Sequence, residues 1–343
     1  FPYTPLFRSR GGVVAHLRAG REAAFGADKQ ALLLGIGQKL SKLELGGWQI
    51  QCKAGAVDHA VDTEAEAFAC ARRFLSYLPS SVHATPPLAP YTDSAPRNDE
   101  ALLKAIPRDK RRVYKMRPII EALVDAGSFF EMGQLFGRSI ITGLARIEGR
   151  SVAVMAGDPY HYAGAWTADA CAKIIRFVDL AQTFHIPVVH LVDCPGFLVG
   201  LQAEETATIR AGVRVMTALD QCTVPWCSII VRNVFGVAGA LHQPPSRLAL
   251  RYAWPSAHWG SLPLEGGIEA AYRADIDAAP DPKAKLAEIE DRLNKLRSPF
   301  RSAETFWVEE IIDPRDSRKL LCEFVRLAEP LLTPGVASFT MRP

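Results

Sequence analysis

The 343-residue sequence lacks most of the motifs that identify an active site directly. It has no GxSxG, HExxH or Walker A motif, and no GxGxxG follows a predicted strand. Its seven cysteines include no CxxC pair, which argues against a zinc knuckle or a disulfide framework and favours a reducing compartment. No apolar run reaches the roughly 18 residues of a membrane span, and no charged segment followed by an apolar run opens the chain. We therefore expect a cytoplasmic or organelle-matrix protein that does not enter a membrane.

A surplus of charge is also absent, since 40 Lys and Arg oppose 37 Asp and Glu. A chain with a formal net charge of +3 is not expected to bind nucleic acid through bulk electrostatics. What is present, 48% hydrophobic and 22% charged residues, is typical of a globular protein. At roughly 150 residues per domain, the length suggests about two domains.

The first third of the chain is its least regular part. Residues 1–19 begin without Met and open like a translated sequencing adapter, so we expect a non-native leader there; a genuine irregular terminus is the alternative. Residues 20–79 carry helical material and end in a helix predicted over 64–75, whose apolar positions share one face. The proline-rich residues 80–117 are predicted to form a linker. The basic stretch 108–117 is expected to be a solvated helix, and attraction of an acidic ligand is the alternative.

Beyond the linker, short apolar strands alternate with helices. Strands are predicted over 139–147 and 151–156, with a turn between them. A helix at 167–184, a strand at 186–192, a helix at 204–220 and a strand at 226–231 follow in that order. Strands separated by crossover helices imply an α/β fold whose ligands bind at the strand ends.

The turn after the last of these strands could act through its backbone alone. A strand that stops at Gly236 and restarts as a helix near Ala238 presents N–H groups that could stabilise a developing negative oxygen. Removing one such donor typically costs on the order of 3 to 4 kcal/mol of transition-state stabilisation. Alternatively, Gly236 and Gly239 only allow a helix to pack tightly on a sheet. The turn by itself leaves both interpretations open.

Five short motifs then occur in a fixed order. They are Asp125-Ala126-Gly127-Ser128-Phe129-Phe130-Glu131, Thr142-Gly143-Leu144-Ala145-Arg146, Lys173 with Arg176-Phe177, Asp193-Cys194-Pro195-Gly196-Phe197, and Ala253-Trp254-Pro255. Together they resemble the carboxyltransferase (beta) subunit of biotin-dependent acyl-CoA carboxylases, of the propionyl-CoA and methylcrotonyl-CoA carboxylase type. Leu45-Gly46-Gly47 and Gly55-Ala56-Val57-Asp58-His59 look like the end of that family's first half. The resemblance covers about residues 35 to 335.

The resemblance implies a crotonase-like (ClpP/crotonase) α/β fold built of ββα superhelical units in two halves. On this comparison the chain is truncated at its N-terminus: residues 20–79 are a remnant of the first carboxyltransferase domain, and residues 118–343 form the second. The family's first half supplies an oxyanion pair for the acyl-CoA thioester, and no counterpart is found here. The implied mechanism is substrate-assisted, with biotin itself taking the α-proton. No protein base is then required.

The resemblance also assigns site residues. The second-half oxyanion pair, which holds the biotin carbonyl oxygen, falls on the backbone of Val237 and Ala238 after Gly236. Biotin-facing positions fall on Gly164, Asp193, Pro195, Gly196 and Phe197. Ala240 falls near the family's determinant of acyl length, where a small side chain leaves room for a longer or branched acyl group.

Several of these positions keep alternative interpretations. Many propionyl-type members have glycine where this chain has Val237, and a valine that needed positive φ would be strained. The methylcrotonyl-type pattern accommodates a side chain there. Asp193 could instead cap a turn, and Phe197 could belong to the core.

Other polar residues are predicted to be structural. Lys173 is expected to form a solvated helical pair with Asp169. No metal site is expected, because His161, His190, His242 and His258 have no metal-ligand spacing to one another or to a cysteine. An amphipathic helix over 281–297 could pack on a partner subunit.

The resemblance implies biotin carried on a partner, acyl-CoA as substrate, a biotin carboxylase and carrier subunit as partners, and a hexameric homo-oligomer. A biotin-dependent acyl-CoA decarboxylase, whose carboxyltransferase subunit shares the fold, is the nearest alternative. A non-catalytic fragment is the other, and we expect the chain alone to be inactive. The sequence does not identify the acyl group.

Overall fold

The computed structural model describes most of the chain. The described residues are 15–17, 37, 40, 41, 44, 46–93, 97, 99–109, 112–242, 244, 248–260 and 267–337. The predicted leader therefore lies almost entirely outside them. Among these residues, no helix is long and apolar enough to cross a membrane.

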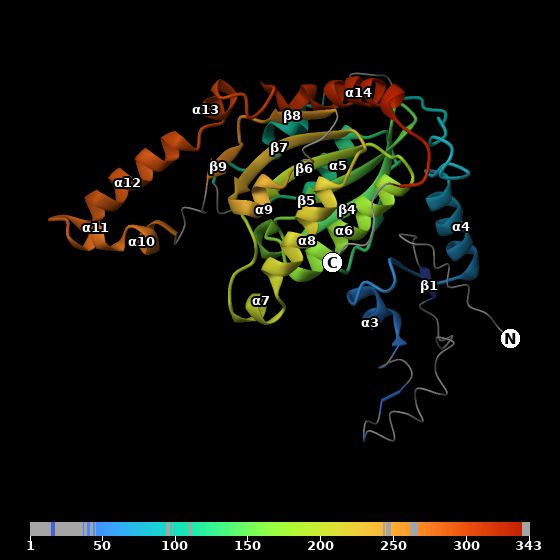
Figure 1. Cartoon of the computed structure of the whole chain (residues 1–343), viewed down its shortest axis with the longest axis horizontal. Helices are drawn as coiled ribbons and strands as arrows, with labels where there is room; N and C mark the ends of the chain where they lie inside the picture. Colours follow the sequence, from blue (N-terminus) through green and yellow to red (C-terminus); the bar gives the residue numbers. More distant parts are fainter. Residues whose placement is uncertain are drawn as a thin grey trace.

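A mixed eight-stranded sheet forms the centre of the molecule (Figure 1). Its strands are β3 (Phe130–Met132), β4 (Ile140–Ile147), β5 (Arg150–Gly157), β6 (Val188–Cys194), β7 (Trp226–Phe235), β8 (Ala249–Ala253), β9 (His258–Gly260) and β10 (Glu310–Ile311). The spatial order is β10-β8-β7-β6-β5-β4-β3, with β9 paired to the end of β7. β4 and β5 form an antiparallel hairpin, whereas β5, β6, β7 and β8 run parallel. The carboxyl ends of β5, β6 and β7 consequently meet at one edge of the sheet.

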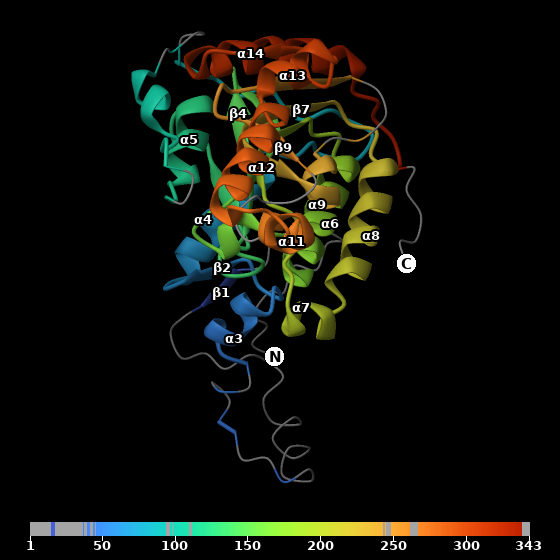
Figure 2. The same ribbon diagram turned by 90° about the vertical axis from the view of Figure 1, so that its left-hand side faces the viewer.

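Helices cover both faces of this sheet. Figure 2 shows α5 (Met116–Leu123) and α8 (Thr208–Asp220) on opposite sides, with α14 (Ser317–Ala328) across one end. One buried cluster joins the sheet to α6 (Ala168–Thr183) and α8, and a second joins it to α5 and α14. Because the central strands are buried on both faces, they are almost continuously apolar in sequence.

The smaller elements lie around this core. They are β1 (Ala15–Leu17) and β2 (His59–Val61), which pair in parallel, and the helices α3 (Trp48–Lys53), α4 (Glu64–Leu75), α7 (Leu201–Glu205), α9 (Gly236–Ala240), α10 (Gly267–Ala271), α11 (Arg273–Asp277), α12 (Pro282–Leu296) and α13 (Pro299–Glu304), with 3-10 turns at Glu100–Lys104, Tyr162–Gly164, Pro314–Asp316 and Glu329–Leu331. The amphipathic helix predicted over 281–297 is confirmed as α12. Asp281 caps it by accepting from the N–H groups of Lys283 and Ala284.

Three sequence predictions about helices need correction. The helix expected over 204–220 is two helices, because Ala207 between α7 and α8 has a φ of 53°. The apolar face expected on α4 is largely exposed, since Phe74 is buried but Phe68 and Leu75 are not. The solvated helix over 108–117 is wrong: described residues 112–115 form no helix, and Arg117 is ion-paired in α5.

The proline-rich segment is fastened to the core at several points. Leu102 and Tyr114 are buried, and Arg97 donates to the carbonyl oxygens of Glu121, Ala122 and Val124 at the end of α5. Arg97 thereby satisfies carbonyls that the last helical turn leaves without partners. The division of the chain into two carboxyltransferase halves at 80–117 stays a prediction.

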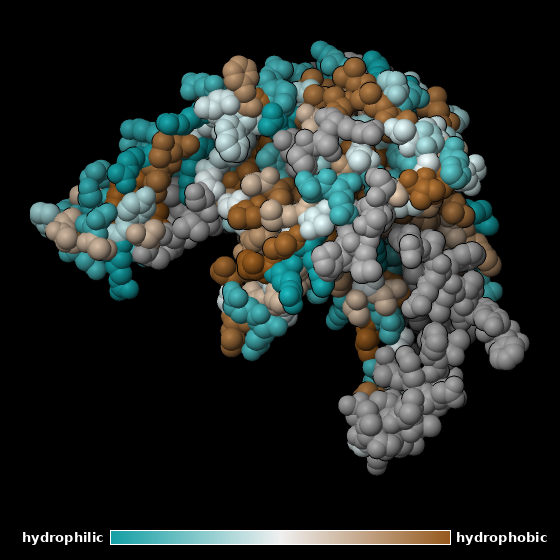
Figure 3. All heavy atoms as spheres, viewed as in Figure 1, coloured by the Kyte–Doolittle hydropathy of each residue, from teal (hydrophilic) through white to brown (hydrophobic). Residues whose placement is uncertain are grey.

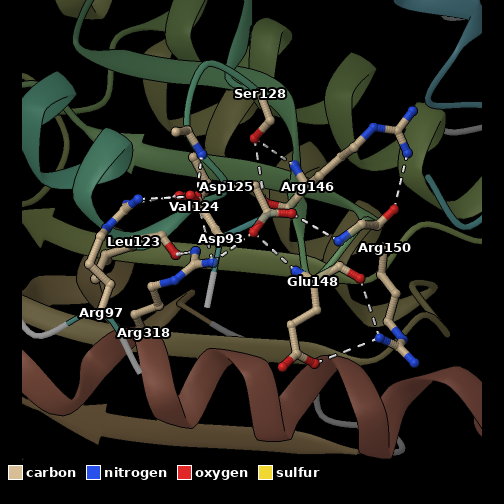
Figure 4. A network of polar contacts seen from close by, with 12 residues as sticks. Asp93, Arg97, Leu123, Val124, Asp125, Ser128, Arg146, Glu148, Arg150 and Arg318 are labelled. Carbon is tan, nitrogen blue, oxygen red and sulfur yellow. Dashed lines mark hydrogen bonds and ion pairs between the residues drawn. The ribbon is translucent and has the colours of Figure 1, made fainter. Parts of the chain in front are cut away.

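A buried ion pair anchors the β4–β5 hairpin to α14. Asp125 accepts from the N–H groups of Glu148 and Gly149 at the hairpin turn, and from Arg318, which is fully buried (Figure 4). The turn predicted from Glu148-Gly149-Arg150 is confirmed, with φ values of 48° and 72° at its first two residues.

Candidate active site at the strand ends

The strand β7 ends in the sharp bend that the sequence predicted. Gly236 opens α9 directly after Phe235 and has a φ of 60°, a conformation that costs glycine little. Val237 is not among the residues with positive φ. The strain that the sequence suggested for Val237 is therefore absent, because Gly236 takes the left-handed conformation one position earlier.

The first turn of α9 leaves backbone donors without intrahelical partners. The first N–H groups of any helix have none, and no side chain caps this one. The Val237 side chain is 57% exposed and Ala238 is fully buried. Ala240, at the end of α9, is exposed. The helix start thus reaches the surface at Val237, whereas Ala238 beside it is enclosed by the fold.

Gly239 has the packing role that the alternative interpretation gave to both glycines. A Cβ there would lie 2.7 Å from the carbonyl carbon of Val234, so a side chain would force α9 off the strand. The two explanations of this turn are therefore compatible: Gly239 packs the helix, whereas Gly236 bends the chain.

Asp193 lies at the centre of a buried polar network. Its carboxylate accepts from the Tyr114 hydroxyl at 2.8 Å, from Arg232 Nε at 3.1 Å and from the Asn233 N–H at 3.1 Å. It is 1% exposed, and Arg232 also donates to the Arg112 carbonyl. Burial, and then the negative charge of Asp193, raise the pKa of Tyr114 well above its usual value. With its oxygens held internally, Asp193 supports the strand ends and leaves no oxygen free for a ligand.

The Asn233 contact falls where the β6–β7 register shifts, between Val192 and Cys194. A side-chain carboxylate thus takes the place of a ladder hydrogen bond three residues before Gly236. Sequence reasoning missed both Tyr114 and Arg232. The available signal was Arg232 itself, because a cation inside an apolar strand needs a buried anion.

The loop after β6 packs against the loop after β5. The backbone N–H of Trp166 donates to the Gly196 carbonyl at 3.0 Å, and the Trp166 carbonyl accepts from the Leu198 N–H at 2.9 Å. A Cβ on Gly164 would lie 2.7 Å from the Asp193 carbonyl oxygen. Gly196 has a φ of 120°, and Pro195 beside it is half-buried. The residues predicted to face biotin are therefore neighbours in space.

Phe197 is half-buried and packs edge-on against Trp166, with ring centroids 6.1 Å apart. It also lies over Gly212 of α8, where an added Cβ would overlap its ring. These contacts fit the core alternative for Phe197.

The prediction for Lys173 is wrong. It is 1% exposed and donates to the carbonyl oxygens of Gly133 at 2.9 Å and Ile140 at 2.7 Å, so it does not pair with Asp169 in solvent. Burial lowers its pKa to about 8. Lys173 joins α6 to the strands β3 and β4.

Two of the histidines, His190 and His242, contact each other in the core, where His190 Nδ1 lies 3.2 Å from the His242 carbonyl oxygen. His190 is buried beside Trp226, and burial lowers its pKa to about 3. His242 is also buried and hydrogen-bonds through Nδ1 with the Gly239 carbonyl. Among the residues that the structure describes, no three His, Cys, Asp or Glu side chains gather as a metal site would require.

Comparison with known proteins identifies the family. The carboxyl transferase domain model matches residues 16–330. The chain is 33% identical over 284 residues to the propionyl-CoA carboxylase beta chain of Roseobacter denitrificans, covering 82% of this chain and 55% of the relative. It is 30% identical over 284 residues to the methylmalonyl-CoA decarboxylase subunit alpha of Veillonella parvula, covering 82% and 54%.

Solved structures of related proteins have the same fold. A transcarboxylase 12S crystal structure, described as a hexamer assembly, superposes with a TM-score of 0.86 at 27% identity, over 96% of this chain and 64% of that one. The crotonase-like α/β fold expected from the sequence is thereby confirmed. The chain spans about half to two thirds of the length of these relatives. On the extent of the match, the chain belongs to the carboxyl transferase domain family.

Proposed function

We propose that the bend at Gly236, Val237 and Ala238 stabilises negative charge on the biotin ureido oxygen during carboxyl transfer to the α-carbon of an acyl-CoA. The observation that carries this proposal is the uncapped start of α9 at the carboxyl end of β7, where Gly236 turns the backbone. Donors at the start of a helix are suited to an oxygen that gains negative charge, because they are fixed before the reaction begins.

The residues around the bend fit a flat, neutral ring system. Gly236, Ala238 and Ala240 have small side chains or none, and Figure 3 shows apolar surface over the region of α7 and α9. Bound as carboxybiotin, the cofactor would supply the carboxyl group that is transferred. The chain's own part is to hold the ureido oxygen with the Val237 and Ala238 N–H groups. Asp193 positions those donors through Asn233.

The packing of the two loops supports the remaining site assignments. In this proposal Gly164, Pro195, Gly196 and Phe197 lie on the biotin side of the bend, and the exposed Ala240 lies nearest the acyl group. A propionyl-type substrate is favoured by the named relatives; a methylcrotonyl-type substrate stays a prediction.

We further propose that the protein works with a biotin carboxylase and a biotin carrier, and that it assembles as a homo-oligomer, hexameric like the transcarboxylase core. A cytoplasmic location stays a prediction.

The test is transfer of a carboxyl group from methylmalonyl-CoA to free biotin. We expect none from the chain alone, and transfer when the amino-terminal carboxyltransferase half of a relative precedes it. In that fusion, Val237→Pro removes one N–H donor and should lower kcat by about 100- to 1000-fold. Val237→Ala keeps the donor and should change kcat little.

Two outcomes contradict the proposal separately. Transfer by the chain alone refutes the division of labour between the two halves. An unchanged kcat in Val237→Pro, with a native melting temperature, refutes the backbone oxyanion site.

Decarboxylation is the second candidate, favoured by the 30% identity to a methylmalonyl-CoA decarboxylase subunit. Both reactions use the same carboxyl transfer, so the bend has the same role in each. Genomic neighbours separate them: a biotin carboxylase gene supports the carboxylase, and a membrane pump gene supports the decarboxylase.

A further inference from the structure

Three buried side chains attach the carboxyl end of α9 to the middle of the sheet. The main-chain carbonyl of His242, two residues after α9, accepts from Trp226 Nε1 at 2.9 Å and from the Ser228 hydroxyl. His190 Nδ1 lies 3.2 Å from the same oxygen. Because a carbonyl oxygen only accepts hydrogen bonds, His190 Nδ1 must carry the hydrogen. Three side-chain donors therefore converge on one main-chain acceptor.

These donors project from one face of the sheet. Side chains alternate along a strand, so Trp226 and Ser228 of β7 point to the same face. His190 of β6 is the register partner of Ser228. All three are at most 2% exposed. Buried polar groups need a hydrogen-bond partner, and here the His242 carbonyl serves all three. The segment after α9 is thereby fixed to two central strands.

The side chain of His242 binds α9 as well. Its Nδ1 lies 3.0 Å from the carbonyl oxygen of Gly239, and it donates there because the carbonyl only accepts. The last carbonyls of a helix have no intrahelical partner, so this contact satisfies one of them. His242 is 7% exposed, and burial lowers its pKa, which favours the neutral ring. Within the described part of the chain, His242 Nε2 has no hydrogen-bond partner. The side chain therefore acts through Nδ1.

α9 is consequently held at both of its ends. At its start, Gly236 follows β7, whose Asn233 N–H is bound by Asp193. At its end, His242 joins Gly239 to the sheet. A helix of five residues has too few internal hydrogen bonds to be stable alone. The direction of its first N–H groups therefore depends on both attachments.

We propose that His242 is a positioning residue for carboxyl transfer, which keeps the Val237 and Ala238 N–H groups directed at the ureido oxygen by fixing the carboxyl end of α9. This inference rests on the function proposed above. His242 touches no substrate and acts only through the helix. Donors directed at an oxygen that gains charge in the transition state affect kcat more than KM. A displaced α9 should therefore lower kcat and leave KM little changed.

Two substitutions of His242 separate this role from general packing. An Asn amide can donate from the place of Nδ1, whereas a Gln amide reaches the place of Nε2. In the fusion described above, His242→Gln should lower kcat by about tenfold or more with little change in KM. His242→Asn should restore most of that loss. His83→Gln is the matched control, because His83 is exposed in the proline-rich segment, and its kcat should equal that of the unaltered fusion.

Hydrogen exchange in the chain alone tests the attachment without any need for activity. The Leu241 N–H donates to carbonyl oxygens of α9 and reports on that helix. Its exchange should be about fivefold faster or more in His242→Gln, because a hydrogen bond that holds the helix end is lost. It should stay slow in His242→Asn and in His83→Gln. If His242→Gln fails to fold, Ser228→Ala, which removes a donor to the His242 carbonyl without adding bulk, gives the same comparison.

Unchanged exchange in His242→Gln, or an equal loss of kcat in His242→Gln and His242→Asn, overturns the inference. Its failure differs from failure of the proposed function. If Val237→Pro lowers kcat but His242→Gln does not, the backbone oxyanion site is supported and the role of His242 is refuted. If Val237→Pro leaves kcat unchanged, the proposed function is refuted, and the role of His242 in transfer is refuted with it.

Discussion

The buried pair of Asp193 and Arg232 gives the sharpest test of how the strand ends are held. Their side chains are 0% and 6% exposed, with Arg232 Nη2 3.0 Å from the carboxylate. Asp193→Asn keeps the shape of the side chain but leaves the Arg232 charge buried without its partner. Removing one member of a buried pair costs about 3 to 5 kcal/mol of unfolding free energy. The Arg112 carbonyl and the Tyr114 ring still contact Arg232, so we expect the lower end, about 3 kcal/mol.

A double-mutant cycle isolates the pair. Arg232→Met alone should also destabilise, because it leaves Asp193 charged and buried, whereas Asp193→Asn/Arg232→Met should cost clearly less than the sum of the two single changes. Urea unfolding followed by tryptophan fluorescence measures all four forms. Lys285→Met provides an exposed comparison, since the pair of Lys285 and Glu288 is 34% and 62% exposed and should contribute less than about 1 kcal/mol. Additive effects, or a loss below about 1 kcal/mol in Asp193→Asn, would refute the reasoning.

Two further changes test the packing around the site. The unfolded chain keeps a proton on Lys173 up to about its ordinary pKa of 10.5, whereas the folded chain releases it near 8. The unfolding free energy should therefore rise by up to about 3 kcal/mol between pH 8 and pH 10.5. Urea titrations of Lys173→Met should lack that rise. An equal rise in Lys173→Met would contradict the assignment of the pH dependence to Lys173. Gly212→Ala lies inside α8, where alanine ordinarily stabilises by about 1 kcal/mol. Here its Cβ would overlap the Phe197 ring, so the melting temperature should fall. Adding Phe197→Ala should restore part of the lost melting temperature. A higher melting temperature in Gly212→Ala would contradict the contact between Gly212 and Phe197.

The sequence was sufficient for the elements whose pattern is local. The strands from β4 to β7, the helices α6 and α12, and the bend at Gly236 all follow from apolar runs, caps and glycines within a few positions. The break at Ala207 was not predictable in this way, because nothing in the residue type favours positive φ. Only the surrounding packing determines it.

The contacts of the polar residues were harder to predict, because their partners come from distant parts of the chain. Lys173 and Asp169 are spaced like a helical pair, yet the carbonyl oxygens that bind Lys173 belong to Gly133 and Ile140, 40 and 33 positions earlier. Tyr114 lies 79 positions before Asp193. The spacing of apolar residues predicts which face of a helix is buried. It does not predict which polar group from another part of the chain will contact that face.

The same long-range contacts hold the bend that we propose to be catalytic, although its residues are ordinary ones. Val237 and Ala238 carry no special side chain, so the geometry of their N–H groups has to be fixed by others. Asn233 is held by Asp193, and Gly164 packs on the Asp193 carbonyl. The three loops after β5, β6 and β7 are therefore one connected unit, and the side chain at position 237 is left free to vary in solvent. A change at Asp193 should consequently disturb the donors more than most changes to the Val237 side chain itself.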